Sequence, residues 1–546
     1  MYKIEYSNKR FLVVENVNQS RDTLKVFANT LGALKVDTSH HAPDILSLCE
    51  NIEFDVILLG YDLGDDKKNG QQILEELRTK KLISRQCAIV MITAEVSQAM
   101  VLAALEHKPD EYLAKPYTLN DLSTRLQRSF QKKIAMLDIY NAMDSNNYQK
   151  VLSLCENAIS DNSIYKTECL GIKSRQYFEL KQFEKARDIY NSYNGARNCQ
   201  WAAIGLGKIA IEEKDYPLAI THFSEVIKDY PLYLTAYDWL AKAYQLNKQS
   251  NIAEETLGKA LLVSPLSVAR LEKYADLCVD NENFDKATYA FSKTTDLAYH
   301  SVHKKPENTL HFVEALLEYG QKLSSLEVRK LSYKAFKAMN VMAKDFNSAE
   351  VKIRTKLLSA RLHKKIKDPQ LSKEALKDAE RLLNQFKLQM SDSGTLSIAK
   401  SLIALDRKSY ANDLLDSLAQ TNINNSNILN KIDSLCSISS RRNHTITAQN
   451  ALEVGVNLYR NGQYTLAIIE LRKALVHFPN HVGIKLNLLQ VLLVTVEKNL
   501  ERVKNLQEAE LLITELKNLE PNSESYIRFR KLNENYKLIL QSMIKI

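Results

Sequence analysis

Short apolar runs alternate with helix-like stretches over the first 130 residues. The runs Phe11–Val14, Phe54–Leu59 and Ala88–Ile92 have the length and composition of buried parallel strands, and Glu111–Ala114 leads into Lys115-Pro116. Helical spacing of apolar residues marks about 19–31, 70–80, 97–106 and 119–130. The alternation predicts a parallel sheet covered by helices on both faces. Functional groups of such sheets gather at the carboxyl ends of the strands.

A repeat of 34 residues takes over from about residue 134. Small and large apolar residues keep their register through three successive units: Gly207, Ala241 and Ala275; Ala219, Ala253 and Ala287; Phe223, Leu257 and Phe291. The first two of these units end at Pro231 and Pro265, where proline stops a helix. A single unit cannot bury its apolar face, so neighbouring units must stack into a solenoid.

Weaker units flank this block. A later pair ends at Pro479 and Pro521, whereas residues 300–445 are helical in pattern but drift out of register. The stretch Thr421–Asn443 is rich in Asn and Ser, which favours a loop or hinge. Two interpretations stay open: one solenoid with an irregular middle, or two arrays joined at that stretch.

Composition narrows the class of protein. The 546 residues carry a net charge of +9 among many acids, which favours a mixed, solvated surface over a nucleic-acid-binding one. Seven cysteines never form a C-x-x-C pair, so the sequence predicts a reducing compartment and no zinc site. The N-terminus lacks a signal-peptide layout, and no apolar run approaches the ~18 residues that span a membrane. We expect a cytoplasmic protein without membrane insertion.

The first domain resembles the receiver domain of bacterial response regulators over roughly residues 10–132. That resemblance implies a doubly wound, flavodoxin-like α/β fold with five parallel strands, and it rests on landmarks in the family's order. The family has two acids after the first strand, an acceptor aspartate after the third, Thr or Ser after the fourth, and an aromatic residue before Lys-Pro. The corresponding residues here are Glu15 and Asn16, Gly60, Thr93, Tyr112, and Lys115 with Pro116.

The departures from this pattern remove chemistry. Gly60 has no side chain and cannot attack phosphorus. Magnesium prefers hard oxygen ligands, and only Glu15 remains as an anionic one beside the neutral Asn16, so we expect Mg²⁺ binding to be weak or lost, with no cofactor. Asp62 is the open alternative acceptor. On a strand it shares a face with Gly60 but lies about 6.6 Å further along.

The remaining landmarks suggest a fixed switch. Lys115 normally pairs with the missing acceptor, so pairing with Glu15 is the simplest way to avoid a lone buried charge. Thr93 and Tyr112 then hold one conformation and present the face of the fourth and fifth helices to a partner. The alternative is that both residues serve only packing.

The helical part is similar to the tetratricopeptide repeat family, which has this 34-residue period and this small–aromatic–proline skeleton. That resemblance implies an all-α superhelical solenoid with a protein-binding groove. The expected organisation is a receiver-like domain at 1–132, tetratricopeptide repeats at 133–299, irregular helical repeats at 300–445 and C-terminal repeats at 446–546.

Together these features favour a non-catalytic adaptor of two-component signalling. It would bind one signalling protein through its pseudo-receiver and a helix or extended peptide in the solenoid groove. The alternative is a phosphorylatable response regulator that uses Asp62 and has the repeats as its output. A purely structural assembly protein is a third possibility, and a DNA-binding regulator is disfavoured. No enzymatic activity is expected.

Overall fold

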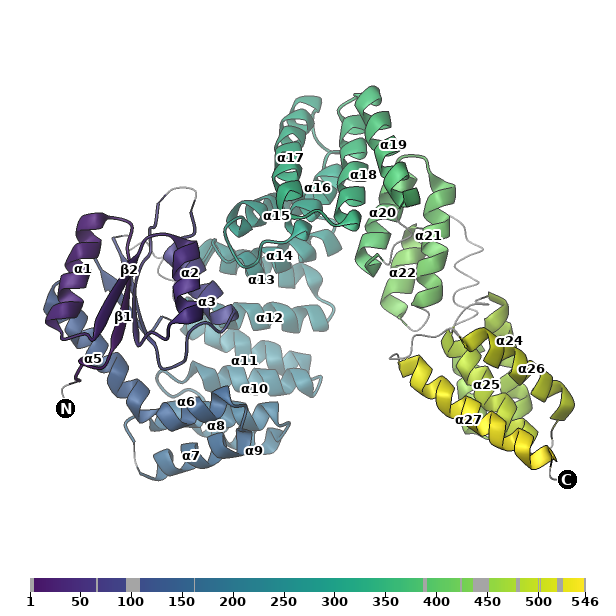
Figure 1. The fold of residues 1–546 in the computed structure, drawn as a ribbon, viewed down its shortest axis with the longest axis horizontal. Coiled ribbons are helices and arrows are strands. Elements are labelled where there is room, and N and C mark those ends of the chain that lie inside the picture. The colour runs from purple at the N-terminus through teal and green to yellow at the C-terminus, as the bar shows by residue number, and fades with distance from the viewer. Residues whose placement is uncertain are drawn as a thin grey trace. The chain divides into compact units, whose positions relative to one another are not determined.

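The structure is a computed structural model and describes residues 4–64, 67–94, 109–161, 163–385, 390–422, 425–435, 451–477, 482–498, 500, 502–517 and 524–544. The chain forms two compact units, Met1–Phe346 and Asn347–Ile546. Both are drawn in Figure 1, and each is described by itself.

A five-stranded parallel sheet forms the core of the N-terminal domain. Its strands are β1 (Arg10–Val14), β2 (Lys35–Ser39), β3 (Val56–Gly60), β4 (Ala88–Thr93) and β5 (Glu111–Ala114). They lie in the order β2-β1-β3-β4-β5, and every neighbouring pair is parallel. The expected doubly wound fold is therefore confirmed. The edge strand β2 was not predicted from apolar runs because its sequence, KVDTS, is mostly polar.

Helices cover both faces of this sheet. Side chains at alternate positions of β1 and β3 point to opposite faces and enter two separate cores. One core holds residues of α2 (Ala42–Asn51) and α3 (Gly70–Thr79), and the other holds residues of α1 (Asn18–Thr30) and α5 (Leu119–Ala135). The helix expected at 97–106 lies outside the described residues.

Twelve helices follow in the same unit and pack in consecutive pairs (Figure 1). They are α6 (Leu137–Asp144), α7 (Tyr148–Ser160), α8 (Lys166–Glu179), α9 (Phe183–Tyr193), α10 (Gln200–Glu212), α11 (Tyr216–Asp229), α12 (Leu234–Leu246), α13 (Ser250–Val263), α14 (Val268–Asp280), α15 (Phe284–Ala298), α16 (Pro306–Tyr319) and α17 (Ser325–Asp345). The chain thus continues as an array of helical repeats.

The repeat register seen in the sequence corresponds to buried positions. Ala219, Ala253 and Ala287 are fully buried. Gly207 shows why the small position matters: a Cβ there would lie 2.4 Å from the ring of Phe223 on the next helix. The turns between paired helices also repeat, because Lys214, Lys248 and Glu282 all adopt left-handed backbone conformations with φ of 64°, 60° and 60°. These turns could not be recognised from residue type, since none of the three residues is Gly or Asn.

The second unit is also helical. It contains α18 (Ala349–Lys365), α19 (Pro369–Gln385), α20 (Asp392–Ala404), α21 (Lys408–Thr421), α22 (Ser426–Leu435), a helix at 451–460, α24 (Tyr464–His477), α25 (Val482–Glu497), α26 (Arg502–Leu516) and α27 (Glu524–Ile544). One apolar cluster runs through it, from Ile353 to Ile539.

One expectation about this unit was wrong. The Asn- and Ser-rich stretch predicted as a loop or hinge contains the end of α21 and the whole of α22, while residues 436–443 lie outside the described part of the chain. Leu429 and Ile432, three residues apart, bury α22 in the core, and its polar composition hid this spacing. The division of the chain into two units falls between Phe346 and Asn347. The domain boundaries expected at 299/300 and 445/446 stay predictions.

Candidate functional site

The predicted receiver pocket forms at the carboxyl edge of the sheet. Glu15 follows β1, Gly60 ends β3, Thr93 ends β4 and Lys115 follows β5. The sheet register fixes these positions, and the backbone N–H of Lys115 donates to the carbonyl of Thr93 at 2.8 Å. Parallel pairing therefore gathers residues that are up to 100 positions apart in the sequence.

An ion pair fills the centre of this pocket. Lys115 Nζ lies 2.9 Å from Glu15 Oε2, and the Glu15 side chain is only 2% exposed. Glu15 Oε1 also accepts a hydrogen bond from the backbone N–H of Val17 at 3.3 Å. The expected pairing of these two residues is confirmed. A buried carboxylate without such partners would be strongly unfavourable.

Because Gly60 has no side chain, the Glu15 carboxylate can occupy the space beside residue 60. A Cβ built on Gly60 would lie 2.9 Å from Glu15 Oε2 and 3.0 Å from the carbonyl oxygen of Val14. Real side chains do not tolerate such approaches without a shift of the neighbouring group. The absent side chain and the inward position of Glu15 are thus two parts of one arrangement.

The edge of the pocket around Asn16, where the sequence predicted weak or lost Mg²⁺ binding, carries little negative charge. Asn16 is half-exposed, and its amide lies close to Gly64, where a Cβ would stand 3.3 Å from Asn16 Nδ2. Arg21 donates to the carbonyl oxygens of Glu15 at 2.8 Å and Asn16 at 3.3 Å, which brings a fixed positive charge to the same edge. Among the described residues, no three His, Cys, Asp or Glu side chains come together as a metal site.

Asp62 lies outside the strand. β3 ends at Gly60, so Asp62 does not share a strand face with Gly60, and its role as alternative acceptor stays a prediction. Asp62 is exposed in the following loop, and its Oδ1 accepts a hydrogen bond from the backbone N–H of Gly64 at 3.0 Å. Local hydrogen bonding of this kind is typical of a turn.

Thr93 and Tyr112, the predicted switch residues, are largely or partly buried. Thr93 is 4% exposed, and Tyr112 is half-buried against the core that α2 and α3 share with the sheet. Tyr117, which the sequence pattern did not predict as a pocket residue, lies near Glu15 and directly follows Lys115-Pro116 in the sequence. Burial and the nearby Glu15 carboxylate raise the pKa of Tyr117 to about 12, so it remains a neutral phenol beside the pocket.

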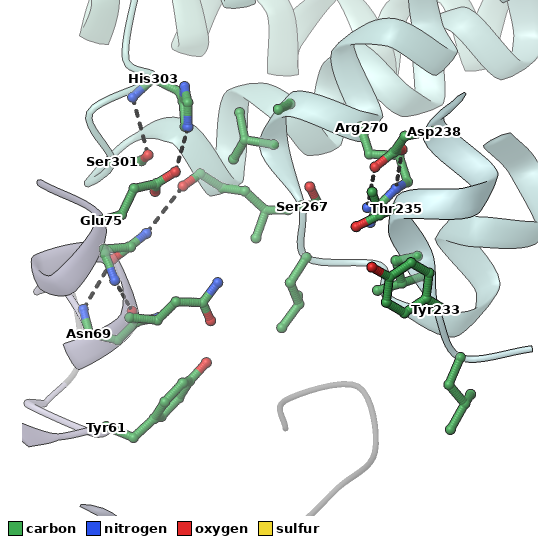
Figure 2. A pocket seen from close by; sticks show the side chains of 18 residues that line it. Tyr61, Asn69, Glu75, Tyr233, Thr235, Asp238, Ser267, Arg270, Ser301 and His303 are labelled. Atoms are coloured by element: carbon green, nitrogen blue, oxygen red, sulfur yellow. Dashed lines mark hydrogen bonds and ion pairs between the residues drawn. The ribbon is translucent and has the colours of Figure 1, made fainter. Parts of the chain in front are cut away.

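The receiver contacts its own helical array through α3. Figure 2 shows Glu75 of α3 facing His303 from the loop that precedes α16. His303 Nε2 and Glu75 Oε1 are 2.7 Å apart, and the Gln72 amide donates to the carbonyl of Leu297 at 3.3 Å. The hydrogen bond that His303 donates to Glu75, together with the negative charge of that carboxylate, raises the pKa of His303 against the opposing effect of burial.

A second set of contacts ties the receiver to the beginning of the array. Arg85 Nε lies 2.5 Å from Asp144 Oδ1, and the Gln86 amide donates to Asn141 Oδ1 at 2.8 Å, both on α6. Lys132 of α5 pairs with Glu168 of α8 at 2.9 Å. These polar contacts at both ends hold the receiver against the array.

A polar cleft of about 720 Å³ lies between the α3 side of the receiver and the starts of α12 and α14. Tyr61, the residue after Gly60, lines it together with Gln71. The opposite wall carries Arg270, whose guanidinium makes a two-point ion pair with Asp238 at 2.8 and 2.9 Å (Figure 2). The residue that follows Gly60 therefore faces the helical array directly.

Comparisons with known proteins match the N-terminal part of the chain. The family model of the response regulator receiver domain matches residues 11–127. Response regulator protein PmrA of Pseudomonas aeruginosa is 33% identical over 75 residues, which are 14% of this chain and 32% of PmrA. A chemotaxis protein CheY homolog of Campylobacter jejuni is 28% identical over 118 residues, which are 22% of this chain and 89% of the homolog.

Among solved structures, a CheY-like receiver domain protein from Methanospirillum hungatei is 23% identical, with a TM-score of 0.21. The match covers 23% of this chain and 95% of that protein. Residues 11–127 are a response regulator receiver domain of the two-component type, followed by a long all-helical region of paired helices. Within the described residues, no helix has the length and apolar character needed to cross a membrane.

Proposed function

We propose that this protein is a phosphorylation-independent adaptor of two-component signalling and has no enzymatic activity. The observation that carries the proposal is the Glu15–Lys115 ion pair at 2.9 Å, formed where a side chain at residue 60 would lie. Phosphoryl transfer needs an in-line nucleophile and a cation that neutralises the transferring group. In this pocket residue 60 has no nucleophile, and the ammonium group of Lys115 already binds the Glu15 carboxylate.

The ion pair also supplies a reason for a constant conformation. In a responsive receiver, phosphorylation of the acceptor changes the contacts of the lysine. Here Lys115 is already paired with the Glu15 carboxylate, and no phosphorylated acceptor competes for it. The pocket then has no second state to which a phosphoryl group could shift the population. A partner that recognises the receiver surface would find it in one conformation at all times.

The helical array gives the adaptor its second surface. The sequence resemblance to tetratricopeptide repeats supports a protein-binding role for these stacked pairs. Because α3 and α5 of the receiver are tied to the array by side-chain contacts, the two parts act as one body in the first unit. Two partners bound to such a body are held at a high effective concentration relative to one another, without any phosphoryl transfer by this protein.

The proposal is tested with a small phosphodonor. The full chain is incubated with acetyl phosphate and Mg²⁺, and its intact mass is measured together with that of a functional receiver protein as positive control. We expect no phosphoryl adduct on this chain. An adduct mapped to Asp62 by peptide mass spectrometry would instead establish the alternative, a phosphorylatable regulator with the helical array as output.

Binding separates the adaptor from a purely structural protein. In the adaptor, a signalling partner contacts the receiver surface near Tyr112, so charge substitutions of exposed residues in that region weaken its binding. If partner binding to the full chain is unchanged by such substitutions, the receiver serves only to cover part of the array. Absence of duplex DNA binding at low salt would exclude the regulator that reads DNA.

A further inference from the structure

The outer face of α17 has an unusual distribution of side chains. Leu326 and Tyr333 are 78% and 75% exposed, and Asn340 continues the same column one heptad later. Seven residues of α-helix advance by about 10.5 Å and return to nearly the same face. The helix therefore displays two large apolar or aromatic side chains to solvent, one above the other.

A column of lysines runs beside this one. Lys330, Lys337 and Lys344 are all exposed and are also seven residues apart. Within the part of the chain that the structure describes, none of the three has a carboxylate within ion-pairing distance. This differs from Lys334 on the same helix, which pairs with Asp296 at 3.0 Å. The column leaves uncompensated positive charge along the helix.

The opposite face of α17 is buried against the neighbouring helix of the array. Its residues Val328, Ser332, Ala335, Met339 and Met342 are at most 5% exposed, and the helix packs on α16. The exposed columns are thus not a core face that happens to be partly solvated. An amphipathic helix normally turns charged residues to water, whereas this one exposes Leu and Tyr in line with unpaired lysines.

A cleft extends this surface. It has a volume of about 700 Å³, lies between α15 and α17, and is lined by Tyr333, Lys337 and Tyr299. Lys304 Nζ stands 4.3 Å from the centre of the Tyr299 ring and pairs with Asp345 at 2.9 Å, and Asp296, which also lines the cleft, pairs with Lys334. Lys337, which has no such partner among the described residues, leaves its charge available beside the aromatic rings. An apolar side chain of a bound partner fits beside the tyrosines while its acidic groups remain near the lysines.

We propose that α17 is a docking surface for an acidic amphipathic helix of a partner protein. The partner helix lies along α17, with apolar side chains against Leu326 and Tyr333. Its carboxylates, spaced by seven residues, face Lys330, Lys337 and Lys344. Heptad spacing on both sides gives the register, as charged flanking positions do in paired helices. The inference deepens the proposed adaptor role, on which it rests, by giving the chemistry of one partner.

A helix is favoured over a nucleic acid by two features. The lysines form a straight column with an interval of about 10.5 Å, whereas successive phosphates of one DNA strand are much closer together. In addition, exposed Leu326 beside the lysines offers nothing to a phosphate backbone but matches an apolar side chain of a helix. Binding of duplex DNA is therefore an outcome that would contradict the proposal.

The test uses the full chain and a fluorescein-labelled peptide. The peptide has 21 residues to match α17, with Leu at the positions facing Leu326 and Tyr333 and Glu at those facing the lysine column. A second peptide has Gln in place of each Glu. Fluorescence anisotropy is expected to show binding of the Glu peptide, with an affinity that falls as salt rises, and at least about tenfold weaker binding of the Gln peptide.

Two protein variants with the same change in net charge test whether the Glu peptide binds at α17. Lys330→Glu/Lys337→Glu is expected to weaken binding of the Glu peptide by at least about tenfold. Lys373→Glu/Lys377→Glu changes the net charge equally on exposed positions of α19 and is expected to leave binding unchanged. Tyr333→Ala is expected to weaken both peptides, and circular dichroism checks that every variant is folded.

Equal binding by the two charge variants, or tighter binding of duplex DNA than of the Glu peptide, would overturn the docking surface. So would no binding of the Glu peptide to the unaltered chain. None of these outcomes affects the phosphodonor assay, and an adduct on Asp62 would end the adaptor proposal without changing the peptide result. The two proposals therefore fail separately.

Discussion

His303 Nε2 lies 2.7 Å from Glu75 Oε1 and joins the helical array to α3 of the receiver. The two residues are 228 positions apart in the sequence. Glu272 also favours the charged form of His303, whereas Lys305 and partial burial oppose it. Because histidine changes charge near neutral pH, this link between the receiver and the array depends on pH.

The first prediction concerns pH. The pKa of His303 is raised in the folded protein, so the stabilisation by Glu75 is complete below the unfolded value of about 6.5 and is lost as pH rises through the folded pKa. Both side chains are partly solvated, so the effect is small, about 0.5 kcal/mol. Hydrogen exchange of α3 amides is expected to show more protection, after correction for intrinsic rates, below about pH 6 than above about pH 8.

Two substitutions complete this experiment. Glu75→Gln removes the main cause of the raised pKa and is expected to abolish the pH dependence of α3 protection. His40→Gln, at an exposed site between β2 and α2, is the control and is expected to retain it. Equal protection at both pH values in the unaltered chain would show that this contact does not hold the receiver to the array.

The second prediction concerns the Glu15–Lys115 pair. Lys115→Met leaves the buried Glu15 carboxylate without its cation, and we expect a loss of about 3 kcal/mol in receiver stability. Adding Glu15→Gln removes the unpaired charge and is expected to restore more than half of that loss. The measurement is the urea midpoint of the receiver, followed by hydrogen exchange of β1 and β3 amides. A double variant no more stable than Lys115→Met would show that the two side chains are not coupled.

The third prediction concerns residue 60. Gly60→Ala places a Cβ 2.9 Å from Glu15 Oε2 and is expected to lower stability by about 1–3 kcal/mol. Gly60→Asp adds a second carboxylate beside Glu15 and is expected to cost more, with no phosphoryl uptake from acetyl phosphate while Asn16 remains neutral. Mass spectrometry and urea unfolding provide the two readouts. If Gly60→Asp takes up phosphoryl groups as a functional receiver does, the remaining pocket is still competent.

The fourth prediction concerns packing in the array. Gly207→Ala brings a Cβ to 2.4 Å from the Phe223 ring, which is fully buried, so we expect destabilisation by about 1–3 kcal/mol. Gly258→Ala is the matched control. Its nearest neighbour is the Tyr274 ring at 3.5 Å, and the better helix propensity of Ala is expected to stabilise by up to about 1 kcal/mol. Thermal unfolding of both variants measures the difference, and equal effects would argue against close helix contact at Gly207.

The sequence alone determined much of the fold because its signals are local and periodic. Apolar runs marked β1, β3 and β4, and the 34-residue register correctly identified Ala219, Phe223 and their equivalents as buried positions. The same linear pattern located Glu15, Gly60 and Lys115 at strand ends. Their pairing could be inferred because a lone buried lysine is costly. The polar edge strand β2 and the helix α22 were missed, since their composition outweighed their weak periodicity.

Only the tertiary structure decided how distant segments meet. Nothing local relates His303 to Glu75, or places the Glu15 carboxylate in the space beside Gly60, because such contacts depend on the summed geometry of many helices and strands. The division of the chain after Phe346 was hidden for the same reason. A repeat pattern specifies each unit and its neighbour, but side-chain shape over the whole surface determines which faces are covered and which, such as the outer face of α17, stay open.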